Sequence, residues 1–362
     1  MFEIGTGSLL SSDELAEGNI PRISAKSENN GILGYFNTEN LNNARHFENF
    51  ITVNFFGTDG GIFYHPYKAS VEMKVHTLKI TNYEFNSKTG NFIASSLRLA
   101  LTGFGYGNQL SSSKLKELDF KIQLPKTKNG EIDFIFMENF IAELEAQRIA
   151  ELETHLLVTG LKNYYLTDEE KEVLELFRNG ENKMGGGKIT DYQYFTLNWL
   201  FNTIKQGRRL KKEDQISGEI PFVMAGTTNT GVVNYISNPV ANFPKNAITV
   251  DIFGNTFYRN YIFGAGDDTG VYWNSKKDFS QETMLYFATS MSKSLQGKFS
   301  FGKKLRSSQS LDFKISLPTK NGEIDFALME TLISAIQKEV IKDVVLYADK
   351  KIEATKKVVN RD

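Results

Sequence analysis

Two short segments of this chain are crowded with cations, and these residue types are the ones that bind phosphate groups. They hold eight basic residues: Lys205, Arg208, Arg209, Lys211 and Lys212, and then Lys303, Lys304 and Arg306. Such side chains neutralise phosphates and supply a salt-dependent affinity that is blind to nucleic-acid sequence. A cluster of this kind is also common on an ordinary solvated surface, so one cluster alone decides nothing.

Amide, hydroxyl and aromatic side chains elsewhere have the chemistry to recognise the edges of bases. Asn and Arg can form paired hydrogen bonds with adenine and guanine. The segment from Arg22 to Asn30 offers several such groups, and 227–230 offers Thr and Asn. We predict that the following residues contact nucleic acid: Arg22, Lys26, Asn29, Asn30, Tyr64, His65, Asn108, Arg208, Arg209, Lys211, Thr228, Asn229, Asn255, Tyr258, Arg259, Lys303, Lys304 and Arg306.

Catalytic motifs, by contrast, are not found in the sequence. The four histidines are scattered and lack metal-ligand spacing. MGGGK at 184–188 lacks the leading glycine and the following Ser/Thr of a phosphate-binding loop. GFGYG at 103–107 precedes a strand-like stretch and does not open a helix, which disfavours dinucleotide binding. We therefore expect no catalytic residue, no metal site and no cofactor on this chain.

Charge and composition are compatible with binding to nucleic acid. The net charge is -1, but residues 134–178 hold ten Asp/Glu against four Lys/Arg, a local charge of -6, so the remainder sums to +5. This split permits basic faces on either side of an acidic spacer. The chain contains no cysteine, no signal peptide and no apolar run near twenty residues. These traits predict a cytoplasmic protein without a membrane partner.

An internal duplication organises the chain. LDFKIQLPKTKNGEIDF, from Leu118 to Phe134, returns as LDFKISLPTKNGEIDF from Leu311 to Phe326. In both copies, apolar and polar residues alternate as in a half-buried strand, a turn follows, and Asp133 or Asp325 can cap a helix. The unit that we predict is therefore strand, turn and helix, used twice.

The duplication extends beyond this stretch. Glycines, Ile20-Pro21 and Tyr35 recur 200 positions later, and Ile51-Thr52-Val53 returns at 248–250. Both copies also hold an amphipathic run that predicts a packing helix, at 92–101 and 283–295. In contrast, residues 65–100 share little with 259–297. Unlike loops on one scaffold indicate two sites of one kind with different targets, although neutral drift of surface loops is the alternative.

Each copy is followed by a long helix. In the second helix apolar residues recur at steps of three and four, at Met329, Ile333, Ile336, Val340, Val344 and Tyr347. The first helix carries a less regular series at Met137, Ile141, Leu144, Ile149, Leu152 and Leu156. Such stripes need a partner, so we predict an antiparallel coiled coil that separates the domains. The alternative is that each helix folds back on its own domain.

The fold expected is α+β, with two tandem domains of short strands and helices. We place the first domain at 1–133, the first spacer helix and a short helix at 134–178, and a glycine-rich linker at 179–191. The second domain follows at 192–325 and the second spacer helix at 326–362. Residues 194–200, YFTLNWL, have no counterpart before the first copy. We therefore expect its matching strand to come from elsewhere or to lie before Met1.

Taken together, these segments resemble a known family. GRRLKKEDQISGEIPFVMAGTTNTGVVNY, ITVDIFGN and FSFGKKLRSSQSLDFKISLP in the second copy, and GNIPRISAKSENNGILGYF, ITVNFFG, YGNQL and LDFKIQLP in the first, resemble target-recognition domains. Such domains occur in specificity subunits of type I and type IIB restriction–modification systems. TGLKNYYLTDEE at 159–170 resembles the type IIB branch more.

The resemblance implies a non-catalytic subunit that recognises a bipartite asymmetric site on double-stranded DNA. It further implies methyltransferase partners and a possible nuclease or translocase partner, which carry S-adenosylmethionine and Mg. The alternatives are a DNA methyltransferase or nuclease with an unrecognised active site, and a duplicated ligand-binding module.

Overall fold

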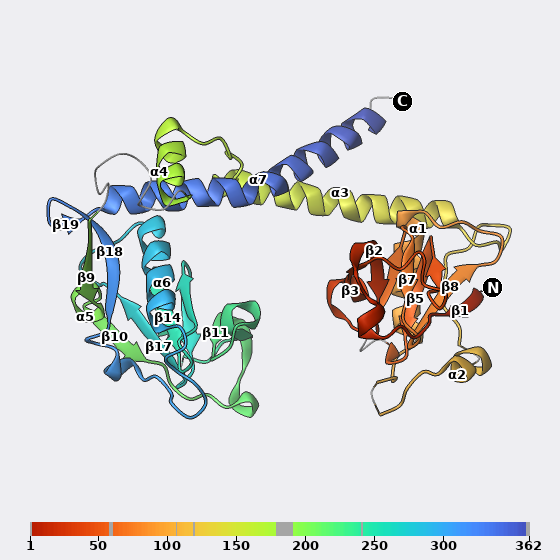
Figure 1. Ribbon diagram of the computed structural model, residues 1–362, viewed down its shortest axis with the longest axis horizontal. Helices are drawn as coiled ribbons and strands as arrows, with labels where there is room; N and C mark the ends of the chain where they lie inside the picture. Colours follow the sequence, from red (N-terminus) through yellow and green to blue (C-terminus); the bar gives the residue numbers. More distant parts are fainter. Residues whose placement is uncertain are drawn as a thin grey trace. The chain divides into compact units, whose positions relative to one another are not determined.

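The computed structural model describes residues 2–57, 61–105, 107–118, 120–178, 191–239 and 242–359 (Figure 1). The predicted linker at 179–191 lies outside these ranges except for Asp191. The chain divides into two compact units: Met1–Leu152 with Lys351–Asp362, and Glu153–Lys350. We call them unit 1 and unit 2 and describe each by itself.

Unit 1 contains two four-stranded sheets. The first has the order β1 (Phe2–Thr6), β8 (Val75–Ile80), β5 (Phe50–Asn54) and β6 (Ile62–His65), all antiparallel. The second has the order β3 (Ile32–Phe36), β2 (Glu17–Ile23), β7 (Ala69–Val71) and β4 (His46–Phe47). Strands β2 and β7 are parallel and the other pairs are antiparallel.

Unit 2 repeats this topology strand for strand. Its first sheet has the order β10 (Thr203–Gln206), β17 (Thr269–Trp273), β14 (Ala247–Asp251) and β15 (Thr256–Arg259). Its second has the order β12 (Val232–Ile236), β11 (Ser217–Val223), β16 (Phe263–Ala265) and β13 (Asn242–Phe243), again with one parallel pair, β11 and β16. The register also repeats, since Ile51 faces Leu78 in unit 1 and Ile248 faces Tyr272 in unit 2. The duplication read from the sequence is therefore a duplication of fold.

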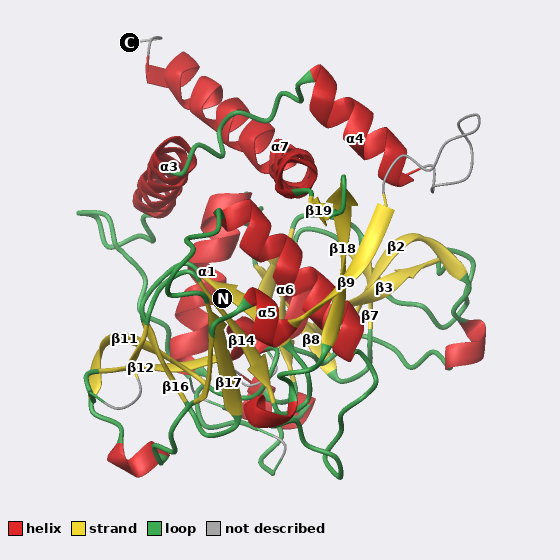
Figure 2. Ribbon diagram, turned by 90° about the vertical axis from the view of Figure 1, so that its left-hand side faces the viewer, coloured by secondary structure: helices red, strands yellow, loops and turns green. Residues whose placement is uncertain are grey.

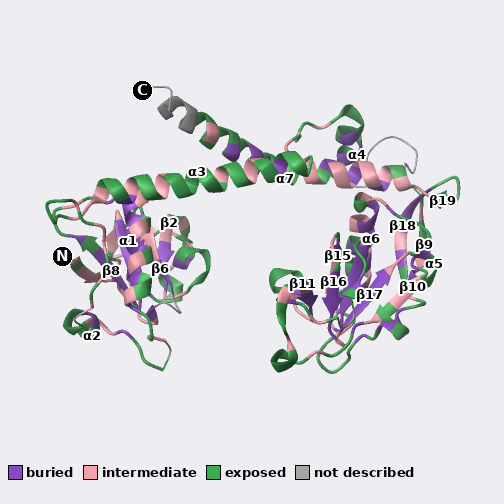
Figure 3. Ribbon diagram, turned by 180° about the vertical axis from the view of Figure 1, so that it is seen from behind, coloured by how far each residue is buried: buried purple, intermediate pink, exposed green. Residues whose placement is uncertain are grey.

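A helix packs on the first sheet of each unit and closes its core. α1 (Ser87–Ala100) contributes Ile93 and Leu97, and α6 (Gln281–Leu295) contributes Phe287 and Met291, all buried. Figure 3 shows these buried faces in purple. The two helices predicted at 92–101 and 283–295 are confirmed, although each begins earlier in the chain. Their first turns are capped by Asn86 and Ser280, whose side chains accept backbone N–H groups.

The two units differ at the stretch that the sequence repeats most closely, 118–134 and 311–326. In unit 2 this stretch contains β18 (Lys314–Lys320), which pairs with β9 (Asp191–Thr196) and β19 (Glu323–Ile324). The short helix α5 (Leu197–Leu200) follows β9. In unit 1 the described residues between Leu118 and Leu124 form no strand. Phe120, Ile122 and Leu124 still pack against the core. Our prediction of a strand here is wrong, because none of the described strands of unit 1 supplies the hydrogen-bonding partner that β9 supplies in unit 2.

The first long helix is α3 (Phe134–Val158), and it begins where predicted. Asp133 Oδ1 accepts the Phe136 N–H at 2.9 Å, and Met137 enters the core of unit 1. From 143 to 148 every residue is exposed, so this stretch does not pack on the domain that precedes it (Figure 3). Gly160, with φ 73°, follows the helix end in a conformation that glycine adopts without strain.

The second long helix is α7 (Phe326–Val359), and Asp325 Oδ1 accepts the Leu328 N–H at 3.0 Å. Met329, which we predicted to face the other long helix, is buried in the core of unit 2 instead. Farther along, the predicted stripe is wrong: Val340 is 74% exposed, whereas Leu332, Ala335, Val345 and Ala348 are buried. The periodicity alone did not identify the packed face, because a second helix, α4, packs on α7 at Leu332 and Ala335.

α4 (Asp168–Arg178) lies against α7 within unit 2 (Figure 2). It begins with the predicted capping box: the Thr167 N–H donates to Glu170 at 2.8 Å, and the Glu170 N–H donates to Thr167 Oγ1 at 3.2 Å. Val173 and Leu174 pack on Leu332 and Ala335.

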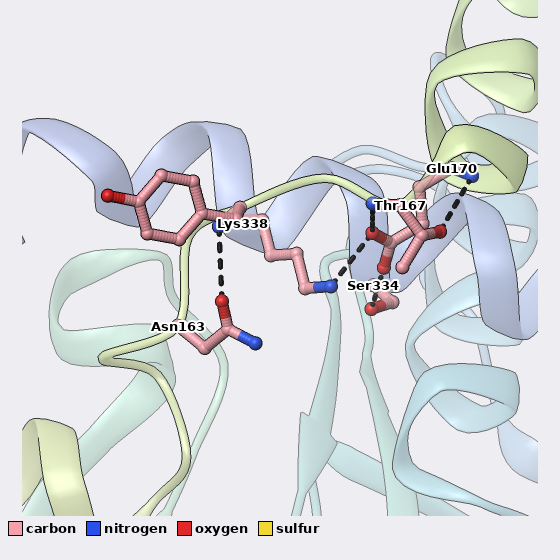
Figure 4. Close-up of polar contacts among 6 residues, drawn as sticks. Asn163, Thr167, Glu170, Ser334 and Lys338 are labelled. Carbon is pink, nitrogen blue, oxygen red and sulfur yellow. Dashed lines mark hydrogen bonds and ion pairs between the residues drawn. The ribbon is translucent and has the colours of Figure 1, made fainter.

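The buried Glu170 carboxylate joins α4 to α7 (Figure 4). It accepts hydrogen bonds from Ser334 Oγ at 2.7 Å and from Lys338 Nζ at 2.8 Å. Burial alone would raise the pKa of Glu170, but the ion pair with Lys338 and the hydrogen bonds outweigh burial and hold the pKa at about 2. The carboxylate is therefore ionised at neutral pH and fixes α4 in place.

Candidate nucleic-acid interface

One turn recurs in both units between the first two strands of the second sheet. Between β2 and β3, Asn29 and Asn30 have φ of 48° and 51°, and between β11 and β12, Asn229 and Thr230 have φ of 47° and 52°. All four side chains are exposed. Two consecutive left-handed residues other than glycine are uncommon, and Thr230 is β-branched, for which such a φ is an outlier. Strained backbone of this kind persists where the surroundings fix it, often at binding sites.

In unit 2 the buried side chain of Arg259 holds this turn. Its guanidinium donates to Thr230 Oγ1 at 3.0 Å, to the Thr230 carbonyl, and to Thr249 Oγ1 and Tyr261 OH at 3.1 and 3.0 Å. Only 2% of Arg259 is exposed, and desolvation lowers the pKa of the guanidinium. A side chain buried to this degree cannot reach a base edge. In place of the predicted direct contact, we therefore assign Arg259 the role of supporting the turn.

His65 occupies the matching place in unit 1. Its Nε2 lies 2.9 Å from Thr52 Oγ1, the counterpart of Thr249, and its Nδ1 lies 3.2 Å from Tyr67 OH. The ring is fully buried, and this desolvation lowers the pKa of His65 to about 4. It is neutral at physiological pH and, like Arg259, lies too deep for the direct contact predicted from the sequence.

Arg22 is a third predicted contact that the fold buries. It is 2% exposed, and its guanidinium donates to the Ser8 carbonyl at 3.0 Å and reaches Ser70 Oγ at 3.4 Å. Burial lowers the pKa of the group. Arg22 therefore links the start of the chain to the second sheet of unit 1.

Three other predicted residues are partly buried and fixed by local hydrogen bonds. Tyr64 OH donates to Asn49 at 2.9 Å, and Tyr258 OH donates to Asn246 at 3.2 Å; burial raises the pKa of both tyrosines. Asn255 Nδ2 donates to the Asp251 carboxylate at 2.7 Å. These groups stabilise the β5–β6 and β14–β15 hairpins.

The two cation clusters of unit 2 meet at the segment 265–269. The Arg208 N–H donates to the Ala265 carbonyl at 2.9 Å, and the Arg306 guanidinium donates to the Asp267 carbonyl at 2.8 Å. Gln206 Nε2 donates to the same Asp267 carbonyl at 3.0 Å. Segments about a hundred residues apart in sequence thus present exposed cations at one end of the domain: Arg208, Arg209, Lys211, Lys303, Lys304 and Arg306.

The strained turn of unit 2 is tied to the same segment. Asp268 Oδ2 accepts the Ala225 N–H at 3.0 Å, and the Gly266 N–H donates to the Val223 carbonyl at 2.9 Å. Asp251 Oδ2 accepts the Gly226 N–H at 3.0 Å. The segment that precedes the exposed Thr228 and Asn229 is therefore bonded to the same segment 265–269 as the cation clusters.

Unit 1 builds the matching surface with fewer cations. Asn29 and Asn30 are exposed, and Lys26 is half-buried beside them. Asn108, the counterpart of Lys303, is exposed, donates to the Gly103 carbonyl at 3.2 Å and accepts from Lys114 Nζ at 3.1 Å. The same fold thus presents amide side chains in unit 1, Asn108 and Gln109, at the positions where unit 2 presents Lys303 and Lys304.

The part of the chain that the structure describes contains no group of three or more His, Cys, Asp or Glu side chains that could hold a metal ion. Nor is any of its helices long and apolar enough to cross a membrane.

Comparison with known proteins identifies the family of this chain. The family model described as "Type I restriction modification DNA specificity domain" matches residues 1–154 and 189–346. This chain belongs to that family. Each matched region contains one copy of the two-sheet unit. The first region also includes most of α3, and the second includes the first part of α7.

Two individual relatives add to this assignment. The specificity subunit S.BcgI of a type II restriction enzyme from Heyndrickxia coagulans is 32% identical over 145 residues. That match spans 40% of this chain and 41% of the relative. A crystal structure of a type I restriction–modification S subunit from M. genitalium superposes with a TM-score of 0.54 at 15% identity, over 99% of this chain and 92% of that one. The latter likeness shows that this specificity-domain protein shares the tandem fold.

Proposed function

We propose that this chain is the DNA-specificity subunit of a restriction–modification complex. Each unit recognises one part of a bipartite, asymmetric target on double-stranded DNA. The observation that carries the proposal is that one fold, repeated with the same register, presents different exposed side chains at matching places. In the turn, Asn30 of unit 1 occupies the position equivalent to Thr230 of unit 2. In the loop, Asn108 of unit 1 is equivalent to Lys303 of unit 2. Domains with one frame and unlike contact groups suit two different half-sites.

The proposed contacts follow from exposure. In unit 2, Arg208, Arg209, Lys211, Lys303, Lys304 and Arg306 bind phosphates, and Thr228 and Asn229 reach toward bases. In unit 1, Asn29, Asn30 and Asn108 take the base-reading role, with Lys26 beside them. The buried Arg259 supports the turn of unit 2. The buried Arg22 and His65 stabilise the sheets of unit 1, and Tyr64, Tyr258 and Asn255 stabilise the β5–β6 and β14–β15 hairpins.

The two long helices act as the spacer in this proposal, and their antiparallel pairing stays a prediction. Within unit 2 it is supported by Lys162, which follows α3. Its Nζ lies 2.7 Å from Glu153 of α3 and 3.3 Å from Asp349 of α7. The described end of α3 is thereby joined to α7.

The chain itself is proposed to be non-catalytic. Methyltransferase subunits, and a nuclease or translocase where the system has one, would dock on it and carry S-adenosylmethionine and Mg. Exposed apolar residues on the helices, including Phe136 at 50% and Val340 at 74%, are suited to such docking.

Mapping of methylated positions tests the proposal. The chain is expressed with its methyltransferase subunit in a host that lacks other methylation, and the genome is sequenced for modified bases. We expect a bipartite motif with a fixed gap between unlike halves. Methylation at one continuous motif, or methylation that is the same when the chain is omitted, would contradict the proposal.

A further inference from the structure

Phe301 lies at the tip of a rigid hairpin loop between exposed cations. The Ser300 N–H donates to the Lys303 carbonyl at 3.1 Å, and the Lys303 N–H donates to the Ser300 carbonyl at 3.0 Å. These reciprocal bonds close a two-residue turn of Phe301 and Gly302. Phe301 is 82% exposed, and none of the large apolar side chains described is more exposed.

The base of this loop is fixed to the domain, so its tip has a defined position. The Leu305 N–H donates to the Ile252 carbonyl at 2.9 Å, and Leu305 is buried. Phe299 packs on the core of unit 2, and Arg306 is bonded to Asp267. The base of the loop is therefore anchored to the core of unit 2, and Phe301 lies beyond this anchor.

One lysine lies against the exposed ring, and a second is on the same turn. Lys304 Nζ lies 4.8 Å from the centroid of the Phe301 ring, and Lys303 is exposed on the same turn. An isolated exposed apolar residue needs no explanation. Phe301, however, belongs to the segment of the second cation cluster, with Lys303 and Lys304 directly after its turn. Apolar wedges beside cations are the means by which proteins unstack a base step and bend a duplex.

The duplication provides an independent argument. Gly107, Leu110 and Ser112 correspond to Gly302, Leu305 and Ser307, so Tyr106 corresponds to Phe301. Tyr106 itself lies outside the described residues, but the bonds that flank it match: the Gly105 N–H donates to the Asn108 carbonyl at 3.3 Å, and the Asn108 N–H donates to the Gly105 carbonyl at 3.1 Å. The neighbouring cations are replaced by Asn108 and Gln109. The sequence thus keeps an aromatic residue at this position while the residues that follow it change.

We propose that Phe301 stacks on a base at a deformable step of the half-site bound by unit 2, with Lys303 and Lys304 on the adjoining phosphates. This inference rests on the proposed function. It adds a contact by shape and stacking to the hydrogen bonds of the turn residues, and pyrimidine–purine steps are the ones that such a contact favours.

The test uses the full complex of this chain with its methyltransferase subunit and a duplex that contains the mapped target. 2-Aminopurine replaces the base at each position of the unit 2 half-site in turn. With the native chain, we expect a rise in fluorescence on binding at one step. Phe301→Ala should abolish that rise and weaken binding by about 5- to 150-fold, the effect of losing one base stack. Phe301→Trp should retain both.

Two further variants separate this inference from the proposed function. Tyr194→Ala removes an aromatic side chain that is 73% exposed on β9 and should change neither signal. Lys303→Ala with Lys304→Ala should weaken binding yet keep the fluorescence rise at saturation. If the Phe301→Ala variant keeps both the fluorescence rise and the affinity while the lysine variant weakens binding, the proposed stacking of Phe301 is overturned and the proposed function stands. Failure of the native complex to bind its duplex specifically would overturn both.

Discussion

Arg259 donates hydrogen bonds to both the hydroxyl and the carbonyl oxygen of Thr230, a β-branched residue whose φ is 52°. A buried cation thereby holds a turn that is unfavourable for its own sequence. The turn exposes Thr228 and Asn229 at the proposed DNA surface. The geometry of the contact groups in unit 2 thus depends on a side chain that does not itself reach the surface.

Replacement of Arg259 by Met should destabilise unit 2. The change leaves Thr230 and Thr249 without their buried donor, which costs about 2–4 kcal/mol of the free energy of unfolding. Both tryptophans, Trp199 and Trp273, lie in unit 2. Tryptophan fluorescence during denaturation therefore reports this unit alone. The exposed Arg208→Met is the control, with an expected change below about 0.5 kcal/mol. Equal denaturation midpoints for Arg259→Met and the native chain would refute the supporting role.

His65 should make unit 1 sensitive to mild acid. Its folded-state pKa of about 4 lies below the ordinary 6.5, so stability is complete above pH 6.5 and falls as the pH drops toward 4. Between pH 7 and 5 the loss is about 2 kcal/mol. Hydrogen exchange of β5 and β6, corrected for intrinsic rates, measures it.

His65→Gln is the matched variant, since glutamine can still bond to Thr52 but does not titrate. Its β5 and β6 amides should lose protection less between pH 7 and 5. A pH dependence as steep as that of the native chain would show that His65 is not its source.

Glu170→Gln should loosen α4 from α7 at neutral pH. The depressed pKa of about 2 means that this carboxylate stabilises the fold above pH 4.5, and that the contribution is lost as the pH falls toward 2. At pH 7 the variant should lose about 2–3 kcal/mol of protection in α4 amides. The difference from the native chain should shrink below pH 4.5. The exposed neighbour Glu169→Gln should change protection little, and an equal effect of both variants would argue against the ion pair with Lys338.

Lys303→Ala with Lys304→Ala should weaken DNA binding for every sequence alike. Each lysine that neutralises a phosphate adds about 0.9 to the slope of log affinity against log salt, so the slope should fall by roughly 2. Lys276→Ala is the control. Lys276 follows the C-terminal end of β17, whereas the cation clusters contact the segment at its N-terminal end, Thr269. Loss of discrimination between sequences without loss of affinity would contradict the assignment to phosphates.

Much of the fold could be predicted because the duplication constrains it. Asp133 and Asp325 begin helices in both copies, and Thr167 with Glu170 forms the expected capping box. These signals are local: a cap or an amphipathic helix depends on residues a few positions apart. The strand predicted at Leu118 failed for the opposite reason. Alternating side chains permit a strand, but only a partner strand completes it, and sequence pattern does not reveal that partner.

The candidate site was only partly accessible from sequence. Arg208 and Arg306 could be selected because cation clusters are visible in the chain, and the fold links both clusters to the segment 265–269, where Arg208 bonds to Ala265 and Arg306 to Asp267. Arg22 and Arg259 have the same residue type but are buried. Whether an arginine faces solvent depends on acceptors contributed by distant segments, such as Ser8 and Thr230, and these are known only once the strands are placed.

A segment exchange tests most directly the claim that each unit reads its own part of the target. Residues 58–109, which include β6, β7, β8 and α1, are replaced by the corresponding residues of another family member, and methylated positions are mapped for the native and exchanged complexes. One half of the bipartite motif should change, while the other half and the methylation level are kept. A motif in which both halves change, or neither does, would contradict two independent readers on one frame.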